Sequence, residues 1–199
     1  MSLSQSKLSE NLNSAFQKVQ DENLSSFDAA QEMASAIVDY ANDAEILTIP
    51  GPFLIPAGSP DTSLLLPKPK TLKVATPSPV VSAASNALGS AIFASFEAKD
   101  PTLVGLSTAL IAFTSAYFTI FSDESVIPVT ATGLTVMAPP GPAPAFVSAL
   151  AAGLSGAERA RVIEVMSAGI HLSFLASIFT GVAVNPSVAS TGPVTGPLI

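Results

Sequence analysis

Proline is concentrated in one passage of this chain, and that passage limits the folds available to the sequence. Eight prolines lie between Ile49 and Pro79, together with Gly51 and Gly58. Proline fixes φ and lacks a backbone N–H, so neither a helix nor a central strand is expected here. The passage also carries the apolar runs 53–55 and 64–66, which a flexible linker would lack. It is therefore predicted to be an extended arm that lies on a surface, its own or a neighbour's.

Two further stretches share this composition. One runs from Ile127 to Pro144, and the other follows Val184 and includes Pro186, Pro193 and Pro197. We therefore predict a single helical domain over residues 1–185. It contains the proline-rich arm at 49–79 and a second proline-rich loop at 127–144, and an extended C-terminal arm, 186–199, follows it.

Apolar periodicity and capping residues predict helices between these stretches. Leu8, Leu12, Phe16 and Val19 lie on one face of a helix over residues 4–20. Ser25, followed three residues later by Asp28, resembles a capping box for a helix over residues 27–43.

Serine–proline and aspartate–proline pairs predict the next helices, because both pairs favour helix starts. We expect a helical hairpin over residues 78–96 and 101–121, a short helix over 144–152, and a last helix from Gly156 to Thr180 that stops at Gly181. The fold class predicted is mainly α: helical hairpins or a bundle joined by proline-rich extended arms, with little or no sheet. Short strands around Thr130–Met137 remain an alternative for that stretch.

The charge content predicts an unusual surface. Hydrophobic residues make up 48% of the chain and charged residues 12%, about half the usual fraction. So few charges favour a surface that is covered by partners or by lipid. The net charge of −7 argues against nucleic acid as a partner. The one basic cluster, Lys68, Lys70 and Lys73, is interpreted as part of a solvated loop.

A membrane hairpin is the main alternative. Pro101–Ser122 has no charged residue and Val165–Val184 has only His171, and both are long enough to span a bilayer. Against this, the first stretch is rich in serine and threonine, its flanks are acidic, and the chain has no tryptophan. We therefore expect buried core helices and no membrane.

Catalytic chemistry is missing from the sequence. There is no cysteine, and His171 is the single histidine, so thiolate and multi-histidine metal sites are excluded within one chain. His171 is expected to be a core or interface histidine satisfied by a hydrogen bond. No catalytic residue, cofactor-binding residue or metal ligand is assigned, and an enzyme is not expected.

The second half of the chain resembles a known group of proteins. The segments 142–146 (PAPAF) and 149–156 (ALAAGLSG), followed by a helix that ends in 179–182 (FTGV), are similar to those of small alanine- and proline-rich helical structural proteins of tailed bacteriophage virions. The helical stretches 29–40 and 101–121 fit the same pattern. The resemblance implies a virion protein assembled in the host cytoplasm, without catalytic residues.

These observations predict a structural subunit of the neck, tail, baseplate or capsid. Its partners would be copies of itself and other virion structural proteins. Apolar residues in the arms are the expected assembly contacts: Phe53, Leu54, Ile55, Val194, Leu198 and Ile199. A holin-like membrane hairpin and a soluble adaptor or scaffolding module are the alternatives.

Overall fold

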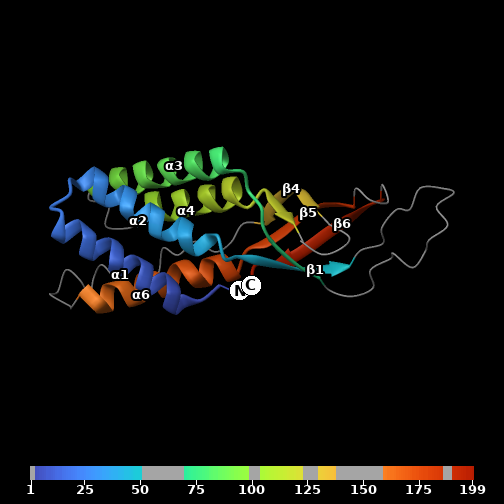
Figure 1. Ribbon diagram of the computed structural model, residues 1–199, viewed down its shortest axis with the longest axis horizontal. Helices are drawn as coiled ribbons and strands as arrows, with labels where there is room; N and C mark the ends of the chain where they lie inside the picture. The colour runs from blue at the N-terminus through green and yellow to red at the C-terminus, as the bar shows by residue number, and fades with distance from the viewer. Residues whose placement is uncertain (1–2, 51–69, 99–103, 123–129, 138–158, 186–189) are drawn as a thin grey trace.

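The computed structural model describes residues 3–50, 70–98, 104–122, 130–137, 159–185 and 190–199. Helices occupy one end of an elongated molecule and strands occupy the other (Figure 1). The chain is mainly α-helical, as predicted, because the helices hold more than twice as many of these residues as the strands. The strands, which hold fewer residues, form a closed barrel that the sequence pattern does not predict.

The first two helices confirm their predictions. Helix α1 spans Gln5–Asp21 and buries Leu8 and Leu12, whereas Phe16 and Val19 of the same predicted face are partly exposed. Helix α2 spans Ser26–Ala41. At its start, the Ser25 hydroxyl accepts a hydrogen bond from the Asp28 N–H at 3.2 Å and donates one to the Asp28 carboxylate at 2.6 Å. Asp28 therefore lies at the position of the capping-box glutamate, but its carboxylate accepts from the Ser25 hydroxyl, whereas the usual glutamate accepts from the backbone N–H of the cap residue.

Helices α3 (Ser78–Glu97) and α4 (Val104–Tyr117) form the predicted hairpin. Helix α3 begins at Ser78, one residue before the start that the serine–proline pair predicts, and the Pro77 carbonyl accepts a hydrogen bond from the Val81 N–H at 3.1 Å. Helix α4 ends four residues before the predicted Phe121, and strand β3 (Ile120–Ser122) follows it. The residues at this change are aromatic and β-branched, which favours extended backbone once a strand partner is present.

The last predicted helix, over residues 156–180, is likewise replaced by a helix and a strand. Helix α6 spans Arg159–Leu175, and strand β5 spans Ile178–Asn185. Gly181 is not a helix stop, because it lies within β5 opposite Val194. Residues 178–184 are rich in β-branched side chains and pair along two neighbouring strands, so tertiary pairing decides their conformation.

The remaining strands lie within the proline-rich stretches or, in the case of β1, at the start of one. They are β1 (Glu45–Pro50), β2 (Lys70–Val74), β4 (Thr130–Met137) and β6 (Ser190–Pro197). The expectation that 49–79 holds no central strand is wrong at both edges of that passage, whereas residues 51–69 lie outside the described part of the chain. The segment 70–74 contains no proline, and its Leu72 is buried between exposed Thr71 and Lys73. The strand left open at Thr130–Met137 is confirmed.

The barrel follows the order of the chain. Each strand pairs antiparallel with the next one, and β6 closes the barrel against β1. Strand β6 pairs with β5 from Ser190 opposite Asn185 to Pro197 opposite Ile178. The predicted C-terminal arm is therefore extended, but it belongs to the barrel of its own chain.

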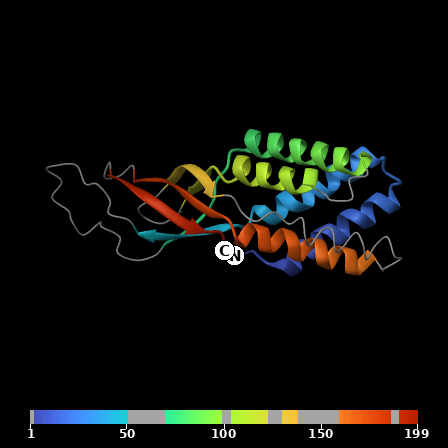
Figure 2. The same cartoon turned by 180° about the vertical axis from the view of Figure 1, so that it is seen from behind.

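The same order of elements, a helix followed by a pair of strands, occurs three times along the chain and links the helical end of the molecule to the barrel. Helix α2 leads into the pair β1–β2, the hairpin α3–α4 leads into β3–β4, and α6 leads into β5–β6. Helix contacts run in the order α6, α1, α2, α3, α4. Three times, a helix passes directly into the first strand of a β-pair, at the junction visible in both views (Figures 1 and 2).

Aromatic side chains fill this junction. Tyr40, Tyr117 and Phe174 lie near the ends of the three helices that enter the barrel, and all are fully buried. Phe118 contacts Phe174 with ring centroids 5.6 Å apart and Phe179 at the same spacing. Within the barrel, buried apolar residues continue the core: Ile46, Leu72, Phe121, Phe179 and Leu198. One hydrophobic core therefore joins the bundle to the barrel.

Candidate functional site: an uncharged helical face

Two glycines allow close approach, one between α3 and its neighbour α2 and the other between α3 and α4 within the hairpin. A Cβ on Gly89 of α3 would lie 2.4 Å from the Gln31 Oε1 atom of α2. A Cβ on Gly105 of α4 would lie 2.9 Å from the Ser95 hydroxyl of α3. Helices with small residues at their contacts can pack at short distance, so the side of the hairpin that faces the core is well defined.

The opposite side of the hairpin is exposed and uncharged. Glu97, the last residue of α3, is the only charged residue in the two helices. We call the exposed side the α3–α4 outer face. Its residues repeat at helical spacing and are small: Ala83, Asn86, Ala87, Ser90 and Ala94 on α3, and Thr108, Ala112, Ser115 and Ala116 on α4.

Two hydroxyls on this face already donate hydrogen bonds within their own helix. The Ser90 hydroxyl donates to the Asn86 carbonyl at 2.9 Å, and the Ser115 hydroxyl donates to the Ile111 carbonyl at 3.0 Å. A hydroxyl that bonds its own helix needs no water as an acceptor. The α3–α4 outer face is therefore less polar than its serine content indicates.

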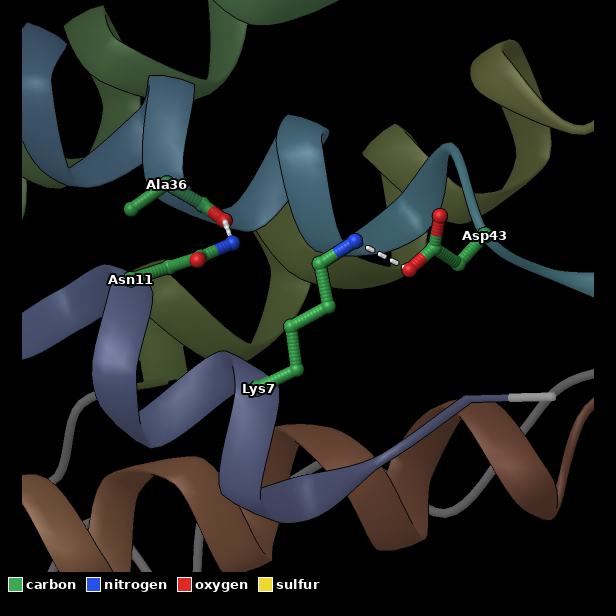
Figure 3. Close-up of polar contacts among 4 residues, drawn as sticks. All are labelled: Lys7, Asn11, Ala36 and Asp43. Atoms are coloured by element: carbon green, nitrogen blue, oxygen red, sulfur yellow. Dashed lines mark hydrogen bonds and ion pairs between the residues drawn. The ribbon is translucent and has the colours of Figure 1, made fainter. Parts of the chain in front are cut away.

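Helices α1 and α2, in contrast to this face, carry charged side chains that pair with each other. Figure 3 shows the Lys7 ammonium of α1 paired with the Asp43 carboxylate that follows α2. In the same view, the Asn11 amide donates to the Ala36 carbonyl at 3.3 Å. Lys18 and Glu32 form a second pair between the helices, at 2.6 Å. The charge of the described helices therefore lies mostly on α1, α2 and the start of α6, and the α3–α4 side has almost none.

The expectation of a buried core helix holds for α6, which buries Ile170 and Phe174, but for only one side of α4. Leu110, Phe113, Thr114 and Tyr117 are buried, whereas the α4 residues of the outer face are exposed in the single chain. The sequence does contain the signal for this face, since residues 79–96 and 101–122 lack charge. It does not show which side of each helix the fold leaves uncovered.

The predicted assembly contacts fall in different places. Phe53, Leu54 and Ile55 lie outside the described residues. Leu198 is 1% exposed and lies in the chain's own core, where it bridges to Ile46, so this side chain is used within the chain. Ile199 exchanges two backbone hydrogen bonds with Glu45, at 2.8 and 3.2 Å. Val194 lies in β6, opposite Gly181 and Pro50.

His171 makes the hydrogen bond that was expected of it. Its Nδ1 atom lies 2.5 Å from the Tyr40 hydroxyl, across the contact between α6 and α2. Burial lowers the pKa of the His171 imidazole, because the protein interior disfavours the charged form.

Other kinds of site find little support in the described ranges. No group of three or more metal-ligating side chains gathers there. A groove between α1 and α6 is lined by polar residues, including Ser9, Glu10, Asn13 and Glu164. The basic cluster is not a loop where it is described: Lys70 and Lys73 lie on β2, opposite Thr48 and Glu45, and Lys68 lies outside the described residues. Among the helices of the described segments, none combines the length and the apolar character needed to cross a bilayer.

Comparison with known proteins gives no relative: no protein-family model, no curated protein and no solved structure matches this chain.

Proposed function

We propose that this protein is a non-enzymatic structural subunit that assembles through the α3–α4 outer face. The observation that carries the proposal is the charge distribution: a two-helix face with exposed alanine, serine and threonine beside a bundle whose other helices carry the charges. Soluble monomers normally mix charges over the whole surface. A face without them is suited to close contact with another protein, because no ion must lose its hydration there.

The partner that fits best is another copy of the chain or a companion subunit of similar surface. Small side chains allow helix backbones to approach closely, and the internal bonds of Ser90 and Ser115 reduce the polar groups left to desolvate. Repetition of one modest interface in a ring or tube also strengthens each contact through effective concentration.

We further propose that the assembly is a tailed bacteriophage virion, in its neck, tail, baseplate or capsid. This step rests on the resemblance of segments 142–156 and 179–182 to small virion structural proteins. A soluble adaptor that binds one partner would share the same uncharged face, and it would differ by forming a single stoichiometric complex.

Light scattering after gel filtration, in buffer without detergent, tests the proposal. The wild-type chain is expected to form a discrete oligomer or polymer. Ala87→Arg on α3 and Ala112→Arg on α4 each place a charge on the outer face, and both variants should shift the chain toward the monomer. Both positions are exposed in the single chain, so the fold should survive.

The matched control is Ser14→Arg, which adds the same charge to an exposed position of α1. It should assemble like the wild type. A wild-type chain that stays monomeric at high concentration would contradict self-assembly. Equal assembly of all the variants would exclude the α3–α4 outer face as the interface.

A further inference from the structure

Tyr40 and His171 meet where two helices enter the barrel. Tyr40 is the residue before the last one of α2, five residues before β1 begins at Glu45, and His171 lies in the last turns of α6. The Tyr40 ring stacks on Phe174 with centroids 5.8 Å apart and meets the His171 ring edge-on at 6.1 Å. The Tyr40 side chain is thus held on two sides, and its hydroxyl points at the imidazole.

The direction of this hydrogen bond follows from the burial of Tyr40. Its side chain is fully buried, and burial raises the pKa of the phenol, so the hydroxyl keeps its proton. A buried hydroxyl proton needs an acceptor. The neutral imidazole supplies one at Nδ1, which places the imidazole proton on Nε2.

We propose that Tyr40 and His171 form a pH-responsive tie between α2 and α6, which weakens when the imidazole takes up a proton. The imidazolium carries N–H groups at both nitrogens and has no acceptor. Tyr40 would then have to accept a hydrogen bond, and its own proton would lose its partner in the core. Acidification therefore loosens α6 from α2 at the barrel junction.

The charged groups near the contact belong to several elements. In the described part of the chain, the charged side chains of the elements around the contact are paired with each other, exposed or, for Glu45, partly buried. On α1 and after α2, Lys7 and Asp43 pair together. Helix α4 contributes Tyr117 and no charge. The others are Asp39 of α2, Glu45 and Lys73 of the barrel, and Arg161 and Glu164 of α6.

The sign of the pH dependence follows from linkage. The pKa of His171 is lower in the folded chain than the ordinary value of 6.5, so the unfolded chain binds more protons as the pH falls. The stability that the neutral imidazole contributes is fully present above pH 6.5. It is lost as the pH falls from 6.5 toward the lower folded pKa.

Thermal unfolding of the full chain between pH 8 and pH 5 tests the tie. The comparison is with His171→Asn, which places an amide oxygen near the position of Nδ1 and does not titrate. Titration of carboxylates is common to both chains. The wild-type Tm should therefore fall relative to that of the variant as the pH drops below 6.5. Parallel Tm profiles would overturn the proposal.

A second measurement does not depend on the stability of that variant. Because His171 is the only histidine, its ring-proton NMR signal reports its pKa directly. We expect a pKa below 6.5 in the wild type and a higher one in Tyr40→Phe, which removes the hydroxyl donor and keeps the ring. A pKa at or above 6.5, or one that Tyr40→Phe leaves unchanged, would show that the hydroxyl does not stabilise the neutral imidazole.

Discussion

The two tyrosines of this chain lie at the ends of different helices, and each one forms a hydrogen bond to a residue of another segment. Tyr40 donates its hydroxyl hydrogen bond from α2 to α6, and Tyr117 donates from α4 to the Asn42 side chain after α2. The backbone of Tyr117 is fixed as well, because the Thr76 hydroxyl donates to its carbonyl at 2.5 Å. Each phenol therefore combines a buried ring with one polar contact across the bundle.

Both phenols should resist ionisation. Burial, with a smaller contribution from the negative charge of Asp39, raises the pKa of Tyr117 to about 12, and burial raises the pKa of Tyr40 as well. The unfolded chain ionises near pH 10, so the stability from neutral phenols is present below pH 10 and lost as the pH rises above it.

We expect no phenolate absorbance near 295 nm between pH 10 and pH 11 while the far-ultraviolet circular dichroism stays native. The two signals should change together when the chain unfolds at higher pH. In 6 M guanidinium, the same titration should show both phenols ionising near pH 10, which provides the control. Phenolate absorbance from a native chain at pH 10 would contradict the buried positions.

At the scale of elements, the cap of α2 gives a direct test of local sequence signals. Ser25→Ala removes the hydroxyl that accepts from the Asp28 N–H. It should lower the free energy of unfolding by about 1 kcal/mol, the usual effect of losing a serine N-cap. Urea denaturation would measure the loss. Ser26→Ala, one position inside the helix, removes a neighbouring hydroxyl and should change the stability little.

The helices with such local signals were the ones the sequence could predict. The apolar spacing of Leu8 and Leu12 located α1, the pair Ser25 and Asp28 located the start of α2, and Ser78 located the start of α3. Spacing and capping act within one or two turns, so one sequence is enough to show them.

The barrel depends on partners that are distant in the sequence. Phe121 and Phe179 belong to apolar stretches that also suit a helix, and they are extended because neighbouring strands pair with them. Strand β6 carries two prolines and two glycines, which disfavour a strand when considered alone. For the same reason the interior position of Leu198 could not be predicted, and an assembly contact was expected there instead.

For the whole molecule, Phe118 is the residue that joins bundle and barrel most directly. Its ring contacts Tyr117 and Phe174 of the helices, and Phe121 and Phe179 of the strands. A core shared in this way predicts that the two ends unfold together, as one cooperative unit.

Phe118→Ala should lower the free energy of unfolding by about 3–5 kcal/mol, the range for a fully buried phenylalanine. Chemical denaturation followed by circular dichroism and by tyrosine fluorescence would measure it. The matched control is Phe27→Ala, whose side chain is 45% exposed and packs on Phe93 alone among the aromatic residues of the described chain. Phe27→Ala should lower the free energy of unfolding much less. Similar losses for both variants would show that Phe118 contributes no more to the stability of the core than Phe27 does.

The closure of the barrel by β6 has a consequence for how the protein is made. Five of the six strand pairs join consecutive strands, whereas β1 pairs with β6 near the other end of the sequence. As the chain leaves the ribosome, β1 emerges early and its second edge stays without a partner until β6 has been translated. An unpaired strand edge can bind other chains. The nascent protein therefore has to keep one edge of its sheet from aggregating for most of its synthesis, and a message that breaks before the codon for Ser190 yields a chain in which that edge never closes.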